Sequence, residues 1–315
     1  MRPPVASPSD GPTRRRVGVL SVQVDLGAGR RGVDMGPSAL RIAGLVSALE
    51  AIDVDVEELG TVTALAPETV PIGPTDARFL EEIARVCGTT RRLLMEAMAD
   101  GCFPLILGGD HSLSIGSVAA VADHHRARGE KIGVIWVDAH TDMNAPETTP
   151  SGNIHGMSLA VLTGRGAPAL TGLADATPAV DPAHVSVIGA REIDPAEKET
   201  VRASGIRVFT MSEVDDRGLP ACLDEAMERA TRGTAGFHVS FDLDSTDPMV
   251  APGVGTPVAG GITYREAHLI CEKLSRSGKL LSFELVELNP VLDQGNRTAQ
   301  FGVELIASAL GKTIL

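Results

Sequence analysis

The chain is short of several residue types, and each shortage excludes a class of protein. Aromatic residues make up only 3% of its 315 residues, so aliphatic side chains must supply most of the core. Its four cysteines are scattered and form no CxxC pair, which argues against a disulfide framework or a zinc knuckle. It has no run of about 18 apolar residues, so we expect no membrane span. Its start has no apolar signal core, and we expect a cytoplasmic protein.

The chain also has too few basic residues to balance its acidic ones. There are 28 lysines and arginines against 41 aspartates and glutamates, which gives a net charge of −13. This excess disfavours nucleic acid and anionic membranes as partners, because both would be repelled. It suits a small cationic substrate, although many cytosolic proteins are acidic for other reasons.

What the chain does contain is a regular alternation of two kinds of segment. Apolar runs rich in β-branched residues are separated, for the most part, by stretches with helical periodicity. This pattern predicts an α/β fold with a mainly parallel, roughly eight-stranded sheet that helices cover on both faces. The strands are expected near 17–22, 54–58, 104–107, 133–137, 185–189, 206–209, 238–241 and 280–286. The helices are expected over 39–51, 79–98, 114–125, 192–203, 221–230, 264–275 and 297–310.

The first residues differ from the rest in composition. Residues 1–15 are rich in proline and lead into a basic triplet that ends at Arg16, so we expect a disordered tail. Proline- and glycine-rich stretches in the remainder are too short to be interdomain tethers. We therefore expect residues 16–315 to form a single domain.

Two acidic clusters stand out, each directly after an apolar run. The first is Asp138-Ala-His140-Thr-Asp142 and the second is Asp242-Leu-Asp244. A spacing of two points alternate side chains to the same side of an extended backbone. So many carboxylates in one pocket would repel each other, and a pair of divalent metal ions is the natural source of compensating charge.

A third strand end carries a histidine that fits the same site. His111 follows the apolar run at 104–107 through Gly-Gly-Asp, and in parallel sheets ligands bind beyond the carboxyl ends of the strands. Four carboxylates and two imidazoles form an oxygen-rich set that suits manganese or iron better than zinc. An isolated Asp-x-Asp is more often a helix cap or a turn, but three such strand ends favour a metal centre. The expected ligands are His111, Asp138, His140, Asp142, Asp242 and Asp244.

These motifs, in this order, resemble those of the ureohydrolase family, which includes arginases and agmatinases. The resemblance extends from about residue 17 to the C-terminus, includes segments 32–41, 255–261 and 287–290, and is closest to the arginases. It implies a three-layer α/β/α fold with two manganese ions per subunit, although Fe²⁺ and Co²⁺ share these ligand preferences. By match of motif, one ion would take His111, Asp138, Asp142 and Asp242, and the other Asp138, His140, Asp242 and Asp244.

The resemblance also implies roles for residues around the metals. Glu287, in Glu-Leu-Asn-Pro290, is similar to the carboxylate that holds the guanidinium, and His155 is similar to the histidine that transfers protons. Asp142 would serve catalysis as well as metal binding. Taken alone, Glu287 would be an ordinary strand-end residue and His155 an ordinary loop residue, so only the motif favours their catalytic roles.

The loop after Asp142 resembles the arginase segment that holds the amino-acid end of the substrate. In the family, matching residues recognise the α-carboxylate with neutral donors and the α-ammonium with an acid. Glu192 departs from the family, since many arginases have aspartate there, and this departure bears on fine specificity. Turn formation is the competing explanation for the asparagine and serine of the loop. The residues expected to contact substrate are Asn144, Thr149, Ser151, Asn153, Glu192, Asp194 and Thr256.

The resemblance therefore implies an enzyme that hydrolyses L-arginine to L-ornithine and urea, with a hydroxide bridging two manganese ions as the nucleophile. The nearest alternative is an amidinohydrolase of another guanidino compound, such as agmatine, guanidinobutyrate or N-hydroxy-L-arginine. A zinc deacylase or a non-catalytic arginine-binding protein is less consistent with six intact ligands. Family members are commonly trimers or hexamers, and Thr263-Tyr-Arg-Glu266 resembles a segment that bacterial members use near subunit contacts. We expect a homohexamer or a homotrimer.

Overall fold

A computed structural model describes residues 15–315 of the chain. Its first strand begins at Arg15, one residue before the expected start of the domain. The rest of the tail expected at 1–15 lies outside the described residues.

The centre of the fold is one eight-stranded sheet, and every neighbouring pair of its strands is parallel. Continuous apolar runs make such strands, because helices bury them on both faces. The order across the sheet is β2-β1-β3-β8-β7-β4-β5-β6. This arrangement confirms the predicted fold class. The strands are β1 Arg15–Gln23, β2 Val54–Thr63, β3 Phe103–Leu107, β4 Gly133–Val137, β5 Val185–Ala190, β6 Arg207–Thr210, β7 Phe237–Asp242 and β8 Leu280–Val286.

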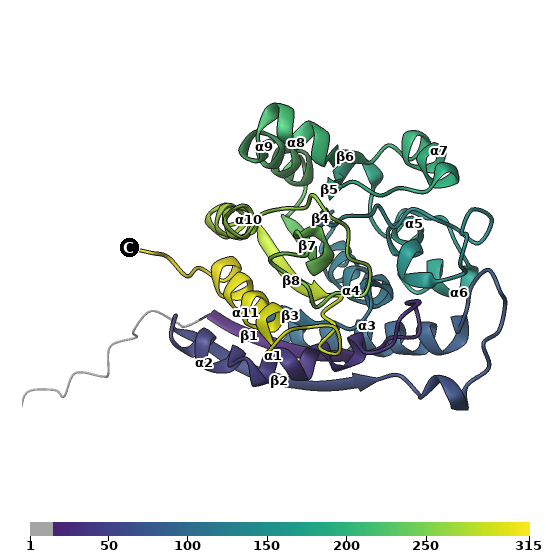
Figure 1. The fold of residues 1–315 in the computed structure, drawn as a ribbon, viewed down its shortest axis with the longest axis horizontal. Helices are drawn as coiled ribbons and strands as arrows, with labels where there is room; N and C mark the ends of the chain where they lie inside the picture. Colours follow the sequence, from purple (N-terminus) through teal and green to yellow (C-terminus); the bar gives the residue numbers. More distant parts are fainter. Residues whose placement is uncertain (1–14) are drawn as a thin grey trace, which may run out of the picture.

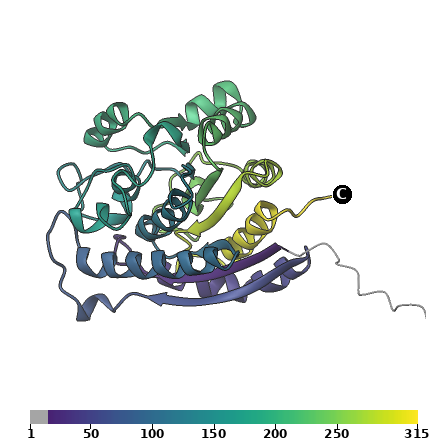
Figure 2. The same cartoon turned by 180° about the vertical axis from the view of Figure 1, so that it is seen from behind.

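Helices form a layer on each face of the sheet, which gives the three-layer α/β/α architecture of Figures 1 and 2. The first layer packs α1, α2 and α8–α11 against one face, and the second packs α3–α7 against the other. Successive strand residues alternate between them: Ile135 and Val137 face the first layer, and Val134 and Trp136 face the second. The helices are α1 Gly36–Ile42, α2 Leu45–Glu50, α3 Leu80–Ala99, α4 Ser114–Arg126, α5 Ser158–Leu162, α6 Pro168–Thr171, α7 Pro195–Ser204, α8 Met211–Arg217, α9 Leu219–Thr231, α10 Tyr264–Arg276 and α11 Arg297–Ala309.

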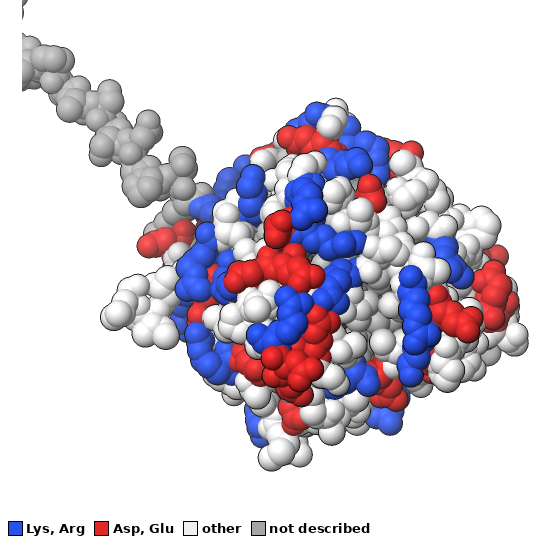
Figure 3. Space-filling view, turned by 90° about the horizontal axis from the view of Figure 1, so that it is seen from above, with Lys and Arg blue, Asp and Glu red and all other residues white. Residues whose placement is uncertain are grey.

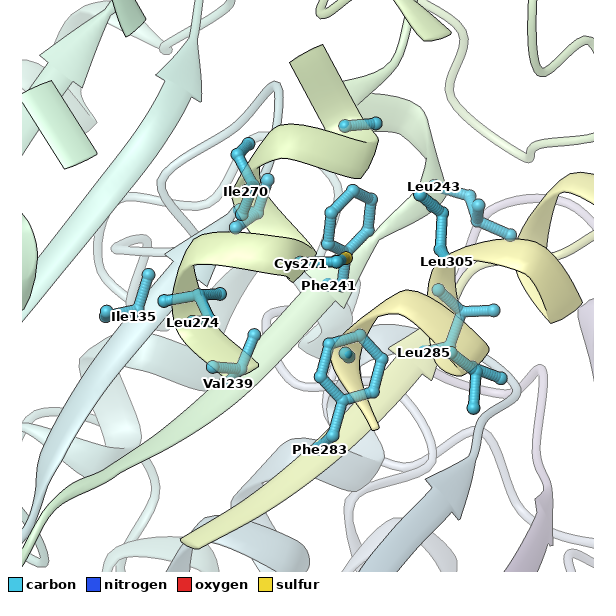
Figure 4. Packing of buried hydrophobic residues seen from close by; sticks show 14 of the residues in the cluster. Ile135, Val239, Phe241, Leu243, Ile270, Cys271, Leu274, Phe283, Leu285 and Leu305 are labelled. Carbon is cyan, nitrogen blue, oxygen red and sulfur yellow. The ribbon is translucent and has the colours of Figure 1, made fainter. Parts of the chain in front are cut away.

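The core between the sheet and α10 and α11 is mostly aliphatic, as the low aromatic content requires. Figure 4 shows Cys271 and Leu274 of α10 and Leu305 of α11 packed over strands β7 and β8. Phe241 and Phe283, on those two strands, are fully buried with ring centroids 6.4 Å apart. These contacts hold the two central strands that end in the second acidic cluster and in Glu287.

Two of the expected helices differ from the helices in the structure. The segment expected as one helix over 39–51 is two helices, because Gly44 takes a left-handed backbone (φ 91°) that an α-helix cannot contain. The helix expected from Glu192 begins instead at Pro195, since proline favours the first turn and Asp194 precedes it with extended backbone. Helices α5, α6 and α8 were not predicted, and all three are short.

All four cysteines are free and buried, as expected of a chain without a disulfide framework. Burial raises the pKa of the Cys87 and Cys271 thiols well above its usual range, so neither is poised for reaction. None of the helices in the described part of the chain combines the length and apolar surface needed to span a bilayer.

Basic and acidic side chains alternate on the face of the molecule that carries α8 and α9 (Figure 3). Arg217 lies 2.7 Å from Glu225, and Arg207 lies 3.0 Å from the same glutamate, while both arginines also contact Glu213. Exposed pairs of this kind contribute little to stability, because solvent screens them. This face therefore lacks the single-sign patch that would attract a polyanion.

The carboxyl ends of four neighbouring strands lie side by side at the middle of the sheet. Backbone register places Leu107 of β3 beside Leu285 of β8, Leu285 beside Phe241 of β7, and Phe241 beside Val137 of β4. The residues that follow this row therefore emerge on one rim. Ligands of open parallel sheets bind at this rim, where loops leave the strands.

Candidate metal centre

His111 and three aspartates converge on one point beyond the ends of β3, β4 and β7. His111 Nδ1 lies 3.2 Å from Asp138 Oδ2, 3.1 Å from Asp142 Oδ2 and 3.1 Å from Asp242 Oδ2. All four side chains are almost completely buried. Three segments far apart in the sequence thus build one polar cluster.

A second group of candidate ligands adjoins the first and shares a residue with it. His140 Nδ1 lies 3.4 Å from Asp138 Oδ1 and 3.1 Å from Asp244 Oδ2. Asp138 faces His111 with one carboxylate oxygen and His140 with the other. Asp138 belongs to both of the three-residue groups that could hold a metal ion, so the geometry suits two ions with a shared carboxylate.

The residues of this cluster fit divalent cations in their chemistry and their unmet contacts. His111 Nδ1 and Asp142 Oδ2 are buried and, among residues 15–315, make no hydrogen bond of good geometry, although they lie 3.1 Å apart. Burial and the charges of Asp244 and Asp138 raise the pKa of Asp242 well above its usual range. Burial and the charge of Asp138 raise the pKa of Asp142 to about 7. A bound cation would lower both pKa values, because it stabilises the ionised carboxylates.

Several neighbouring residues orient the members of this cluster. Ser240 Oγ lies 2.7 Å from His111 Nε2, which leaves Nδ1 to face the aspartates. The Trp136 ring stacks on His111 with centroids 4.1 Å apart and donates from Nε1 to Asp138 Oδ2 at 2.9 Å. Sequence reasoning missed Trp136 and Ser240, because each precedes the acidic cluster inside an ordinary apolar strand.

Asp142 and Glu287 have unusual backbone conformations. Their φ angles are 51° and 64°, in the left-handed region that non-glycine residues seldom adopt. Such conformations cost about 1–3 kcal/mol each and persist where the surroundings impose them, often at functional sites. Both residues occupy the rim at which the ligands converge.

Glu287 and His155 form a buried pair beside the ligand cluster. Glu287 Oε1 accepts a hydrogen bond from the backbone N–H of His111 at 2.8 Å and lies 3.0 Å from His155 Nδ1. Its other oxygen, Oε2, is buried and has no hydrogen-bond partner among the described residues. Burial works against both charges, but the mutual contact lowers the pKa of Glu287 and raises that of His155 to about 9. Both shifts favour an ionised carboxylate beside a protonated imidazole at neutral pH.

A cavity of about 200 Å³ opens directly above the ligands. Every residue expected to contact the substrate lines it or the adjoining chamber. The side chains in question are Asn144, Thr149, Ser151, Asn153, Glu192, Asp194 and Thr256. The structure thus brings the whole predicted site into one cleft.

The polar groups of this cleft are partly engaged with each other. Asn144 Nδ2 donates to Asp194 Oδ2 at 3.1 Å. The Thr149 hydroxyl oxygen accepts from the Gly152 N–H at 3.0 Å, and Ser151 Oγ accepts from the Asn153 N–H at 3.2 Å. These bonds shape a tight loop, as turn formation predicts, and each hydroxyl keeps its proton for a ligand.

Glu197 also lines the cavity and was not predicted. Its carboxylate is buried, which raises its pKa, and it accepts from the Thr141 hydroxyl at 2.5 Å and the Met143 N–H at 2.9 Å. It thereby clamps both neighbours of Asp142. The signal that could have identified it is the helix start Asp-Pro-x-Glu, in which a glutamate at the third position reaches back toward the cap.

Known proteins similar to this chain share its fold over almost its whole length. A model of the Arginase family matches residues 15–311. The arginase of Bacillus caldovelox is 45% identical over 300 residues, which cover 95% of this chain and 99% of that protein. Its native structure has a TM-score of 0.91 at 44% identity, with 96% of this chain and 100% of that one covered.

A more distant arginase is similar as well. The enzyme of Entamoeba histolytica, solved in complex with L-ornithine, has a TM-score of 0.87 at 31% identity and covers 95% of this chain and 99% of its own. The sequence matches and the structural matches therefore both identify arginases as relatives of this chain. The chain belongs to the Arginase family and is a hydrolase that acts on the guanidino group.

Proposed function

We propose that this protein hydrolyses L-arginine to L-ornithine and urea at a pair of manganese ions. The observation that carries the proposal is that Asp138 contacts both His111 and His140. The adjoining cleft is lined by polar groups that could bind the head of an amino acid. The relatives support it, since the arginases of Bacillus caldovelox, Brevibacillus brevis and Entamoeba histolytica align with nearly the whole chain.

The proposed ligands divide into two sets that share two carboxylates. Asp138 would bridge the ions, because one of its carboxylate oxygens faces His111 and the other faces His140. Asp242 would be the second bridge by its match to the family motif. When bound, such a pair supplies the positive charge that generates a nucleophile from water at neutral pH. The first set is His111, Asp138, Asp142 and Asp242, and the second is Asp138, His140, Asp242 and Asp244.

Glu287 would bind the guanidinium group, and His155 would transfer protons. The buried, unpartnered Oε2 of Glu287 is a charged acceptor for a guanidinium N–H, and such charge-assisted bonds are short and strong. His155, protonated through its contact with Glu287, can deliver a proton to the departing amine. Asp142 would hold its metal in the strained position that its backbone imposes.

The far end of the cleft would recognise an α-amino acid. Asn144, Thr149, Ser151 and Asn153 offer neutral donors to a carboxylate, and Asp194 offers an anion to an ammonium group. Glu192 is exposed at the same end, and Thr256 lines the wall beside the metals. The E. histolytica relative was solved with L-ornithine, a compound with the amino-acid head that this end suits.

A panel of guanidino substrates tests the proposal directly. Agmatine and guanidinobutyrate each lack one of the two head groups, so polar groups of the cleft would stay unpaired. With manganese present, we expect kcat/KM for L-arginine to exceed that for either compound by about 100-fold or more. Urea release from one of these compounds, or from N-hydroxy-L-arginine, without release from arginine would overturn the assigned substrate.

We also propose that the protein is a homo-oligomer, with a hexamer ahead of a trimer. In the single chain, Glu266 accepts from the Thr263 N–H at 2.9 Å and so caps α10, while Arg265 pairs with Glu272 at 2.7 Å. Arg265 remains exposed on the surface and is available to a second subunit. Light scattering at micromolar concentration should give a mass several times 32.8 kDa, and a monomer would contradict the proposal.

A further inference from the structure

The Arg191 side chain, just behind the ligand cluster, binds only backbone carbonyl groups. Its Nη2 donates to the carbonyls of Asp244 and Val258, both at 2.7 Å. Its Nη1 donates to Ser245 at 3.0 Å and Gly189 at 3.2 Å, and its Nε donates to Val258 at 3.3 Å. Within residues 15–315, no carboxylate forms an ion pair with it. All three nitrogens of the guanidinium therefore donate hydrogen bonds that join backbone segments.

These segments include both acidic clusters. The backbone N–H of Arg191 donates at 2.8 Å to the carbonyl of Ala139, which lies between the ligands Asp138 and His140. The side chain of the same residue holds the carbonyl of the ligand Asp244. Arg191 therefore connects the two stretches of chain that supply the second metal-binding group.

Arg191 also reaches the side chain of Asp244 through a short relay. It holds Val258, two residues beyond Thr256, and the Thr256 hydroxyl donates to Asp244 Oδ2 at 2.8 Å. That oxygen is the one that lies 3.1 Å from His140 Nδ1. A shift of the 256–258 segment would therefore rotate a ligand carboxylate.

The guanidinium occupies a slot that fits it closely. A Cβ atom on Gly261 would lie 2.6 Å from Arg191 Nη2 and 2.8 Å from the Ser245 carbonyl, so only glycine leaves the slot open. Burial lowers the pKa of Arg191, and the charges of Asp244, Asp138, Asp247 and Asp242 oppose that effect. Those nearby acids keep a cation favourable at this position.

We propose that Arg191 is a positioning residue for the second metal-binding group, Asp138, His140 and Asp244. It fixes the distance between the two acidic clusters and orients Asp244 through Thr256. The inference rests on the proposed two-metal function. A purely structural cross-link would stabilise the same loops but would leave the affinity for metal unchanged.

The variant that tests this inference is Arg191→Lys, which keeps the positive charge but loses the planar array of N–H donors. Arg229→Lys is a matched control, because Arg229 also donates only to carbonyls, those of Val185, Pro182 and Gly205, near the opposite end of β5. Mn²⁺ is titrated into the metal-free full-length chain, and bound ions are counted after dialysis. Thermal unfolding of the metal-free proteins measures the structural cost of each change.

We expect Arg191→Lys to weaken binding of one Mn²⁺ per chain by about 10–100-fold, as loss of an outer partner of a ligand does. Arg229→Lys should bind both ions normally while it lowers the unfolding temperature to a similar extent. Thr256→Val should weaken the same ion, and the double variant Arg191→Lys with Thr256→Val should lose no more than the larger single effect. Normal Mn²⁺ affinity in Arg191→Lys, or losses that multiply in the double variant, would overturn the inference.

Two further results separate this inference from the proposed function. Wild-type protein that binds fewer than two Mn²⁺ ions per chain would remove the two-metal function itself. If Arg191→Lys does not fold, Gly261→Ala displaces the guanidinium from the opposite side and should weaken the same ion. A folded Gly261→Ala protein with normal affinity for both ions would overturn the role of Arg191 alone.

Discussion

Replacing Asp138 by asparagine should leave a folded chain that has lost one metal ion and almost all activity. One oxygen of Asp138 lies 3.2 Å from His111 and the other 3.4 Å from His140, so Asp138 contacts a histidine of each metal-binding group. Asparagine has the same shape but no charge, and it offers one acceptor oxygen in place of two. We expect kcat to fall by more than the roughly 10–100-fold that loss of an outer partner costs.

Metal content after dialysis and turnover in Mn²⁺-limited buffer measure this effect. Asp123→Asn is the matched control, because Asp123 of α4 is a similarly buried carboxylate, away from the cleft, that pairs with Arg91 of α3 and Arg126 of α4. The control should unfold at a lower temperature and keep both ions and its turnover. Near-normal turnover of Asp138→Asn in limiting Mn²⁺ would show that Asp138 does not bridge.

Replacing His155 by asparagine should slow turnover by roughly 10²–10⁴-fold and spare the metals, as expected for loss of a general acid–base group. His155 lines the cavity and contacts Glu287 at 3.0 Å, but it belongs to neither group of ligands. Its pKa is raised to about 9, so the protonated form is present below that pH and is lost as the pH rises through it. Bound cations would lower that value. The wild-type pH profile should therefore fall on its alkaline side at or below this pH, and the variant should lack that limb.

His125→Asn is the control for the loss of an imidazole paired with a carboxylate. His125 lies on α4, and its Nδ1 is 2.7 Å from Glu130 in the segment that follows, so the same kind of pair is removed outside the cleft. Steady-state kinetics across pH should show a wild-type profile for this control. A His155→Asn protein with unchanged kcat, or one that loses bound Mn²⁺, would contradict the proton-transfer role.

Local sequence patterns predicted most of the fold, because strand and helix periodicities depend on neighbouring residues. All eight expected strands overlap those of the structure, and the long helices α3, α4 and α10 begin within one residue of expectation. The expected helix over 39–51 was wrong because periodicity does not reveal a left-handed residue such as Gly44. The expected start at Glu192 was wrong because the stop and start signals of Asp194 and Pro195 outweigh the apolar pattern.

The sequence by itself determined which chemical groups the candidate site contains. His111, the Asp138–Asp142 segment and the Asp242–Asp244 segment each follow a strand, and parallel strands expose such residues on one rim. Only the tertiary structure decided that β3, β8, β7 and β4 are neighbours, which brings His111 to 3.2 Å from Asp138 and 3.1 Å from Asp242. It also decided which residues support them, including Trp136, Ser240, Glu197 and Arg191. Strand order and buried hydrogen bonds join residues about 50–180 positions apart, and contacts of that range leave no periodic signal in the chain.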